Sequence, residues 1–407
     1  MLLSQSPYHL TYCTNIHPGE TWDEVFASLK KYLPEVKAKA TQPGQRMGVG
    51  LRLSHKASEE ILEKDHLATF QRWLESQGMY VFTMNGFPYG GFHHQRVKDT
   101  VHQPDWTTLE RVNYTKRLFS ILAALLPEGQ TGGISTSPLS YKLWLTKAAD
   151  RKQGFELATR NLLQVVEHLY QLEQETGKFM HLDIEPEPDG LLENTQEVLD
   201  YYQTYLYPFA KQVLPERIGV DSGQVEALIK KYVQICYDVC HFAVEYEEPG
   251  QVFQAFENAG IQIGKIQISA ALKADIPEEP ISRSKIHKEF LPFVESTYLH
   301  QVIARNQDGS LTNFSDLPEA LESLESSPAV EWRTHFHVPL FVEAYQWLKS
   351  TQADIVKVVN LLKEKAYTEH LEVETYTWEV LPEDIRLPLG ESIARELNWV
   401  KERIEQE

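Results

Sequence analysis

The segment that decides the fold reads His370-Leu371-Glu372-Val373-Glu374-Thr375-Tyr376-Thr377-Trp378-Glu379, an alternating run that enters a polar loop. Two earlier stretches repeat its pattern, His181-Leu182-Asp183-Ile184-Glu185 and Ile235-Cys236-Tyr237-Asp238. In all three, a short apolar strand runs into a loop where a carboxylate stands. The carboxyl ends of all strands of a parallel barrel lie on one face, where carboxylates from different strands can converge on a metal ion or a reacting carbon. The three stretches therefore predict one shared site.

Short β-like segments alternate with longer amphipathic ones through most of the chain, which is typical of βα units and a parallel sheet. The expected strands cover residues 10–14, 47–53, 80–84, 133–136, 179–185, 234–238, 264–268 and 371–375. With 407 residues and 42% hydrophobic content, the chain can bury the core of one large domain. We therefore expect an α/β fold, a single (β/α)8 TIM barrel over residues 1–407.

This rhythm breaks between the seventh and eighth expected strands, where residues 271–369 intervene. The interval is several times longer than a usual βα connection. Its residues 298–309 carry a hairpin signature that ends in Asn306-Gln307-Asp308-Gly309. No linker rich in Gly, Ser or Pro bounds the interval. We therefore predict an insertion that forms a lid or wall over the carboxyl-end face of the barrel, and not a separate domain.

Composition excludes several classes of function. The formal net charge is -19, with 58 acidic and 39 basic residues, so the surface repels phosphate backbones and anionic lipid. We expect no nucleic-acid partner. The longest apolar run, 118–126, is about half the length that spans a bilayer, so we expect no membrane span. Cysteine is sparse and lacks the spacing of a disulfide framework, which indicates a reducing cytoplasm.

Two carboxylate motifs are candidates for chemistry. Glu185 closes a strand and is followed by Pro186-Glu187-Pro188, which holds the carboxylate near the strand axis. Asp183 shares its face, so the pair is either a metal or acid/base site or a buried pair tied to basic groups. Asp238 could bind a divalent ion while His241 orients a substrate hydroxyl or carbonyl, and a capping arrangement is the alternative.

Further polar residues stand near the expected strand ends. Gln267 faces the barrel interior if its apolar neighbours face the helices, and its amide could ligate a hard cation or form structural hydrogen bonds. Arg333, His335 and His337 alternate along one extended run and so share a face. They could bind an anionic or polyhydroxylated ligand, supply an imidazole to a metal, or stabilise the insertion.

The segment from Asn85 to His94 follows a strand and is rich in turn formers and aromatic residues. It predicts a loop that covers substrate, since no glycine-rich turn leads from it directly into a helix to hold phosphate. Asn15, His17 and Arg52 occupy equivalent strand-end positions and could line the mouth of the barrel. Each of these three residues, taken singly, is more often structural.

Two resemblances follow from these motifs. The order of Glu185, the Asp238-Val239-Cys240-His241 step, an inward polar residue at Gln267, and Glu374 resembles the xylose-isomerase-like TIM-barrel superfamily of sugar isomerases, epimerases and endonuclease relatives. Four longer segments are similar to the EboE-type metabolite traffic proteins, and this resemblance covers essentially the whole chain. These segments are Tyr12 to Trp22, Asn85 to Gly90, Cys236 to His241 and His335 to Leu340.

The superfamily resemblance implies a site for a divalent metal (Mn, Mg, Co or Zn) on the last four strands. Its ligands would be Glu185, Asp238, Gln267 and Glu374. His241 would contact substrate. Gln267 stands where the superfamily has its ligand histidine, so either Gln267 ligates weakly or His335 or His337 replaces the imidazole. The EboE-type resemblance implies the handling or export of a secondary-metabolite precursor, together with partner proteins of the same pathway.

Three functions fit these observations. One is a metal-dependent isomerase or epimerase of a polyhydroxylated small metabolite, in which Glu185 and Glu374 remove and return a proton. Another is a non-catalytic barrel that binds a metabolite and hands it over, with Gln267 marking lost metal affinity. A metal-dependent phosphodiesterase related to the endonucleases is the least favoured, because the chain lacks a basic stripe. The sequence leaves the substrate, the occurrence of catalysis and the oligomeric state open.

Overall fold

A parallel barrel forms the body of the molecule in the computed structural model, which describes residues 1–407 except 92–96, 296, 377, 379–385 and 407. Eight strands form one sheet in the order β1-β14-β7-β6-β5-β4-β3-β2. A bridge between Cys13 and Gly50 and a 2.9 Å hydrogen bond from Thr11 Oγ1 to the Gly48 carbonyl bring β1 to β2, so that the sheet nearly closes. This confirms the predicted (β/α)8 barrel.

All eight expected strands overlap with strands of the barrel. These are β1 (His9–Tyr12), β2 (Met47–Arg52), β3 (Met79–Asn85), β4 (Gly132–Thr136), β5 (Met180–Ile184), β6 (Val233–Asp238), β7 (Ile263–Ile268) and β14 (His370–Val373). Neighbouring strands run parallel, with Glu372 of β14 opposite Gln267 of β7, and Gln267 opposite Asp238 of β6. Because residues in register on parallel strands face the same side, these three side chains share one face of the sheet.

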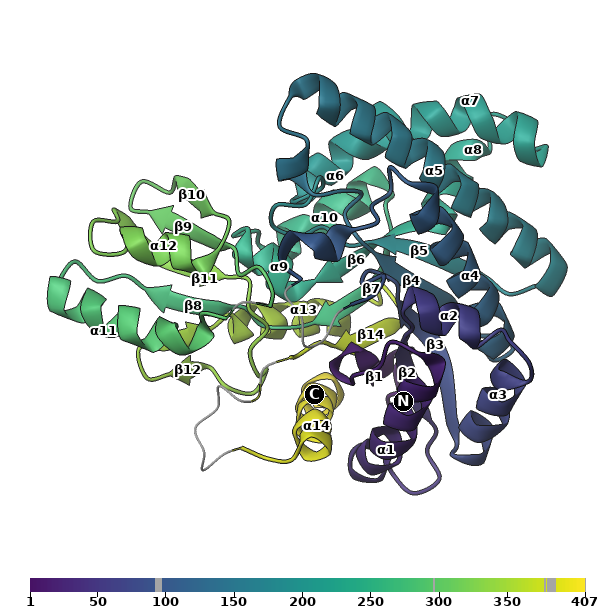
Figure 1. Ribbon diagram of the computed structural model, residues 1–407, viewed down its shortest axis with the longest axis horizontal. Coiled ribbons are helices and arrows are strands. Elements are labelled where there is room, and N and C mark those ends of the chain that lie inside the picture. Colours follow the sequence, from purple (N-terminus) through teal and green to yellow (C-terminus); the bar gives the residue numbers. More distant parts are fainter. Residues whose placement is uncertain (92–96, 296, 377, 379–385, 407) are drawn as a thin grey trace.

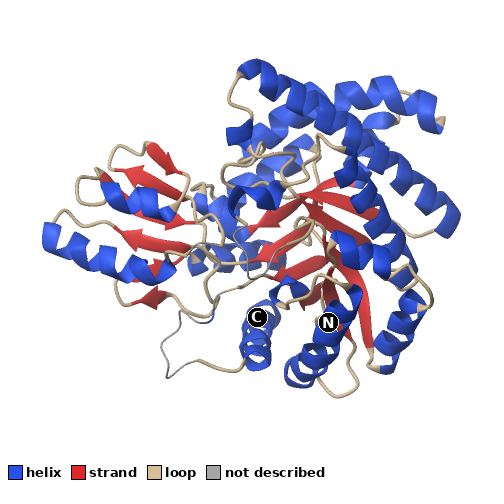
Figure 2. Cartoon of the chain, viewed as in Figure 1, coloured by secondary structure: helices blue, strands red, loops and turns tan. Residues whose placement is uncertain are grey.

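Helices surround the barrel, as Figure 2 shows in blue around the red strands. They are α1 (Trp22–Ala40), α2 (His55–Glu60), α3 (His66–Ser76), α4 (Leu109–Leu125), α5 (Ala148–Thr176), α6 (Thr195–Tyr201), α7 (Tyr207–Ile218), α8 (Val225–Tyr232), α9 (Val239–Val244), α10 (Pro249–Ala259), α13 (Gln352–Glu364) and α14 (Leu389–Glu405). A capping box starts α1: Thr21 Oγ1 accepts from the Glu24 amide at 3.3 Å, and the Glu24 carboxylate accepts from the Thr21 amide at 3.0 Å. None of the described helices is long and apolar enough to cross a membrane.

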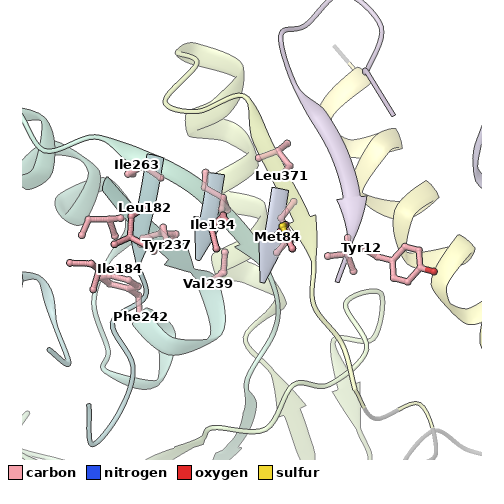
Figure 3. Close-up of a cluster of buried hydrophobic side chains, with 14 of the residues drawn as sticks. Tyr12, Met84, Ile134, Leu182, Ile184, Tyr237, Val239, Phe242, Ile263 and Leu371 are labelled. Atoms are coloured by element: carbon pink, nitrogen blue, oxygen red, sulfur yellow. The ribbon is translucent and has the colours of Figure 1, made fainter. Parts of the chain in front are cut away.

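The apolar core lies between the barrel strands and this ring of helices. Leu182 and Ile184 of β5 belong to it, and Figure 3 shows them in the cluster of buried apolar side chains. Tyr237 of β6 stacks on Phe242 with ring centroids 4.4 Å apart and meets Phe253 of α10 edge to face at 4.8 Å. Full burial of each such side chain contributes about 1.5–3 kcal/mol. The outward face of the strands therefore carries the hydrophobic stabilisation.

The inward face of the same strands is polar. Lys265 Nζ lies 2.7 Å from Glu372 Oε2, and both side chains are fully buried. Below the strand ends, His181 Nδ1 lies 2.6 Å from Asp183 Oδ1. Most TIM barrels fill this space with branched apolar side chains. Here hydrogen-bonded and charged pairs occupy it.

Glycines make room for these inward polar groups. A Cβ atom at Gly264 would lie 1.9 Å from Asp183 Oδ1, and one at Gly50 would lie 1.6 Å from Glu372 Oε1. Neither distance is compatible with any side chain larger than hydrogen. The charged layer beneath the strand ends therefore depends on glycine at these two positions.

The insertion carries a sheet of its own, which Figure 1 shows as a lobe to the left of the barrel. Its strands are β8 (Leu272–Asp275), β9 (Val302–Asn306), β10 (Leu311–Phe314), β11 (Ala329–Thr334), β12 (Ala344–Tyr345) and β13 (Leu348–Ser350), and its helices are α11 (Pro280–Phe290) and α12 (Leu317–Ser323). They pair in the order β10-β9-β11-β8-β13-β12. The predicted hairpin is present as the antiparallel pair β9 and β10, with Gly309 at a φ of +85° in its turn.

The insertion is shorter than the expected interval 271–369, because α13 belongs to the barrel, where it packs between α10 and α14. Its two ends meet: the Thr351 amide donates to the Ala271 carbonyl at 2.9 Å, and the Ala271 amide donates to Thr351 Oγ1 at 2.8 Å. Within the lobe, Trp332 packs against Phe290 and Phe314. The apolar side chains of the lobe are continuous with those around the barrel.

Candidate functional site

Three carboxylates meet at the carboxyl end of the barrel. Glu185 follows β5, Asp238 ends β6, and Glu374 follows β14. Each offers one oxygen atom, and these three atoms lie within 4.8 Å of one another. All three residues are buried. The structure therefore brings together the three acidic residues that the strand-end pattern singled out.

Hydrogen bonds hold two of these carboxylates in place. Asp238 Oδ1 accepts from the His241 amide at 3.1 Å, which makes it the N-cap of α9. The same oxygen accepts from Ser269 Oγ at 2.6 Å. Glu374 Oε1 accepts from Asn15 Nδ2 at 3.2 Å and from the Tyr376 hydroxyl. Both carboxylates are thus oriented by neighbours before any ligand arrives.

The remaining oxygens need a positive partner. Oδ2 of Asp238 and Oε2 of Glu185 accept no hydrogen bond from the residues that the structure describes. Burial raises the pKa of Glu185 well above its usual range, and the charges of Glu374 and Asp238 raise it further. A divalent cation bound by oxygen ligands at about 2.0–2.6 Å holds those ligands at roughly this mutual separation. The donor set therefore fits such an ion.

A cavity of about 130 Å³ opens above the carboxylates. Its polar lining includes Glu185, Glu374 and the imidazoles of His241, His335 and His337. Its apolar lining residues are Phe87, Pro88, Val101, Leu299 and Phe336. The insertion supplies the lining residues 298–301 and 335–337. A ligand in this cavity would meet acids, imidazoles and apolar side chains.

Four of the predicted ligand-contacting residues line this cavity, namely Asn85, His241, His335 and His337. The His241 ring centroid lies 4.6 Å from that of His335 and 5.6 Å from that of His337. His337 Nδ1 is 3.1 Å from the Glu374 carbonyl. Asp238, His241 and His337 also offer ligand atoms within 4.8 Å of one another. The imidazoles of the insertion therefore reach the carboxylate group.

Arg333 lies apart from the residues that line the cavity, which differs from the expectation that it shares a pocket with His335 and His337. Its Nε donates to Glu331 Oε1 at 2.8 Å, and its Nη1 donates to the Ala243 carbonyl at 2.7 Å. β11 ends at Thr334, so the alternation that predicted a common face does not continue to the histidines. Arg333 instead joins the insertion to α9.

Arg52 and His17 are also absent from the cavity lining. Arg52 Nη1 donates to the Gly19 carbonyl at 3.0 Å and lies 3.2 Å from Glu20 Oε1. His17 Nε2 is 2.7 Å from the Tyr12 hydroxyl, and its ring stacks on another tyrosine. Both side chains hold the segment that follows β1, which is a structural role at the rim.

Gln267 is fully buried in the barrel, at the same level as Asp238. Burial raises the pKa of Glu372, and the Lys265 charge and the Gln267 amide oppose this rise, which places Gln267 beside that carboxylate. Neither amide atom forms a hydrogen bond of full geometry within the described part of the chain. Of the expected covering loop from Asn85 to His94, residues 92–94 lie outside the described residues.

Sequence reasoning missed several residues of the site. Glu187 lines the cavity, Ser269 orients Asp238, and Tyr376 contacts both Glu374 and Asn15. Lys265 lies beneath the carboxylates and lowers the pKa of Glu185 against the effect of burial. Two signals were available: Glu187 stands between two prolines, and Tyr376 lies two residues after Glu374 in the opening segment.

Comparison with known proteins gives similarity of fold. No protein-family model and no curated protein matches the sequence. A D-tagatose 3-epimerase-like protein matches with a TM-score of 0.50 and 10% identity, over 98% of each chain. A xylose isomerase-like TIM barrel protein from Mycobacterium smegmatis in complex with magnesium matches with a TM-score of 0.49 and 11% identity, over 98% of this chain and 97% of that one.

The IOLI protein with a bound zinc atom matches at a TM-score of 0.45 and 12% identity, over 98% of this chain and all of the other. The chain shares the TIM-barrel fold. The narrower resemblance to EboE-type proteins stays a prediction from the sequence.

Proposed function

We propose that this protein is a metal-dependent isomerase or epimerase of a polyhydroxylated small metabolite. The observation that carries the proposal is the meeting of Glu185, Asp238 and Glu374 within 4.8 Å, with Glu185 and Glu374 lining a cavity. Isomerisation next to a carbonyl needs one group that removes a proton and another that returns it. Glu185 and Glu374, which both line the cavity, supply such a pair.

The surroundings of Glu185 and Glu374 differ, and they indicate different roles in proton transfer for the two carboxyl groups. Burial raises the pKa of Glu185, and the charges of Glu374 and Asp238 raise it further, which favours this residue as the group that returns the proton. Hydrogen bonds from Asn15 and Tyr376 orient the Glu374 carboxylate, which we assign as the group that removes the proton. If the proton returns to the same carbon from the opposite side, the configuration of that carbon is inverted, which is epimerisation. If the proton goes to the neighbouring carbon, the carbonyl group changes position, which is isomerisation.

Glu185, Asp238 and Glu374 would hold the metal ion, with Gln267 or His337 as a further ligand. The bound ion, Mn²⁺, Mg²⁺, Co²⁺ or Zn²⁺, would polarise a substrate oxygen and so make the neighbouring C–H bond more acidic. The imidazoles that line the cavity would contact hydroxyl groups of the substrate. The apolar lining residues would pack against its carbon atoms and exclude water. In this proposal the insertion is a wall of the cavity.

Deuterium exchange tests the proposed reaction without requiring the natural substrate. Ketopentoses and ketohexoses are incubated with the Mn²⁺-loaded protein in D₂O. We expect the hydrogen next to the carbonyl to exchange for deuterium, and proton NMR measures this exchange. Glu185→Gln and Glu374→Gln should each slow this exchange by at least about 100-fold, the usual contribution of an acid or base. Binding of a sugar without exchange in the natural protein would contradict catalysis.

A non-catalytic binding and handover protein is the second candidate, and Gln267 is the observation that favours it. A neutral amide is a weaker ligand than imidazole for transition metals. We therefore expect Gln267→His to raise the affinity for Mn²⁺ by about ten-fold or more. Titration calorimetry of both proteins measures the change. Equal affinities would show that this position does not serve the ion or that a histidine already does.

The wider setting is also a proposal. The three cysteines, Cys13, Cys236 and Cys240, are free and buried, which suits a reducing cytoplasm. The sequence resemblance supports a role in the traffic or export of a secondary-metabolite precursor, with partner proteins of that pathway. The net charge of -19 makes the phosphodiesterase alternative the least favoured.

A further inference from the structure

A second group of metal-binding side chains lies beside the three carboxylates. Glu187, His241 and His335 each offer one ligand atom, and these atoms lie within 4.8 Å of one another. All three residues line the cavity. Glu187 belongs to the loop after β5, His241 to α9, and His335 to the insertion segment after β11. The proposed reaction uses none of them as an acid, a base or a metal ligand.

The two imidazoles are oriented as metal ligands are. His241 Nδ1 lies 3.1 Å from the Pro186 carbonyl, which can only accept, so Nδ1 carries the proton. His335 Nδ1 lies 2.9 Å from Gln301 Oε1. In both rings this leaves the lone pair on Nε2. Histidines that bind metals commonly donate their other ring N–H to a carbonyl or carboxylate in this way.

One tripeptide, Pro186-Glu187-Pro188, organises the whole group. The Pro186 carbonyl orients His241. The Pro188 carbonyl accepts from Gln301 Nε2 at 3.1 Å, which fixes the amide so that its Oε1 faces His335. Glu187, between the two prolines, supplies the carboxylate. The tripeptide therefore supplies one candidate ligand, the Glu187 carboxylate, and its two proline carbonyls fix the orientation of the other two.

Glu187 itself lacks a counter-charge. It is 6% exposed, and its Oε1 accepts no hydrogen bond from any residue that the structure describes. His102 Nε2 lies 3.4 Å from Glu187 Oε1. No hydrogen bond joins this nitrogen to the Glu187 oxygen. A buried carboxylate without a positive partner is costly, and a cation would remove that cost.

We propose that Glu187, His241 and His335 bind a second divalent cation, separate from the one at Glu185, Asp238 and Glu374. Two nitrogens and one carboxylate oxygen favour a borderline ion such as Zn²⁺, whereas an all-carboxylate set favours harder ions. Three protein ligands leave one coordination position of the ion open toward the cavity. His241 has a single available nitrogen, Nε2, and the proposal assigns it to this ion. The proposal does not rest on the isomerase activity.

The second cation would also link two parts of the fold. His335 belongs to the insertion, while Glu187 and His241 belong to the barrel. A bound ion would therefore fasten the cavity wall to the strand ends, and it would slow opening of that wall because it binds only the closed arrangement. This gives a readout that does not involve turnover.

Zinc stoichiometry tests the proposal. After equilibration of the full chain with Zn²⁺ and removal of free ion, metal analysis should find two equivalents in the natural protein. Glu187→Gln and His335→Gln should each retain one, and Glu374→Gln should also retain one, from the other site. His168→Gln is the matched control, since His168 contacts Ser120 and the Lys116 carbonyl away from the cavity lining, and it should retain two.

Amide hydrogen exchange distinguishes a zinc ion bound at Glu187, His241 and His335 from one bound at the three carboxylates. Zn²⁺ should slow amide exchange at residues 299–301 and 335–338 in the natural protein and in Glu374→Gln, but not in Glu187→Gln or His335→Gln. One equivalent or none in the natural protein, or two in both Glu187→Gln and His335→Gln, would overturn the second site. An inactive protein that binds two ions would instead refute the isomerase proposal and leave this one intact.

Discussion

Glu374→Gln should weaken Mn²⁺ binding by at least about 100-fold, because it replaces a charged ligand in a three-carboxylate group. Loss of an outer partner of a metal ligand already costs about 10–100-fold in affinity. The substitution keeps the shape of the side chain and its contacts with Asn15 and Tyr376. The fold should therefore persist while the ion is lost. Titration calorimetry with Mn²⁺ measures the effect, and circular dichroism reports the fold.

Glu369→Gln is the matched control for this substitution. Glu369 precedes the same strand, β14, and accepts from Thr131 Oγ1 at 3.0 Å at the opposite end of the barrel. Its replacement should leave the Mn²⁺ affinity unchanged. If Glu374→Gln bound Mn²⁺ as tightly as the natural protein does, the three carboxylates would not be the metal site, whatever their proximity.

Lys265→Met should destabilise the protein by about 3–5 kcal/mol, the usual cost of leaving a buried charge without its partner. Lys265 and Glu372 are fully buried and 2.7 Å apart. Burial alone would lower the pKa of the Lys265 ammonium, but the Glu372 carboxylate raises it overall. The variant leaves the Glu372 carboxyl without its partner in the barrel interior. The midpoint of urea unfolding, with its slope, measures the loss.

A double variant separates the missing charge from the missing side chain. Lys265→Met combined with Glu372→Gln should recover much of the lost stability, because no unpaired charge then remains. Lys39→Met removes an ammonium that lies 2.6 Å from Glu391 on the surface, and it should change the midpoint little. Equal losses in the single and the double variant would assign the effect to packing instead of charge.

The barrel was predictable because its signal is local. Each strand alternates or runs apolar over a few residues, and the three carboxylates stand where those runs end, so no knowledge of distant contacts was needed. The inward direction of Gln267 followed in the same way. The hairpin at residues 302–314 carried its own turn residues. These features depend on neighbours in the sequence, and the structure contains them.

Other side chains depend on partners that the sequence does not place next to them. Arg52 contacts Gly19 and Glu20, and Arg333 contacts α9, so neither lines the cavity that their strand positions suggested. Lys265 and Glu372 are far apart in sequence, and the glycines that admit such inward groups lie on other strands. A pairing across the interior of a closed barrel has no periodic signature. Only the arrangement of the strands reveals it.

The hydrogen bonds that join Ala271 to Thr351 have a consequence for how this protein can be altered. Residues 272–350 leave and re-enter the barrel at almost the same point, so their length adds little to the entropy of closing the barrel. We therefore expect changes in the length of this segment to leave the register of β7 and β14 unchanged. The three carboxylates are positioned by the barrel strands, whereas part of the cavity lining comes from a segment that is joined to the barrel at a single point.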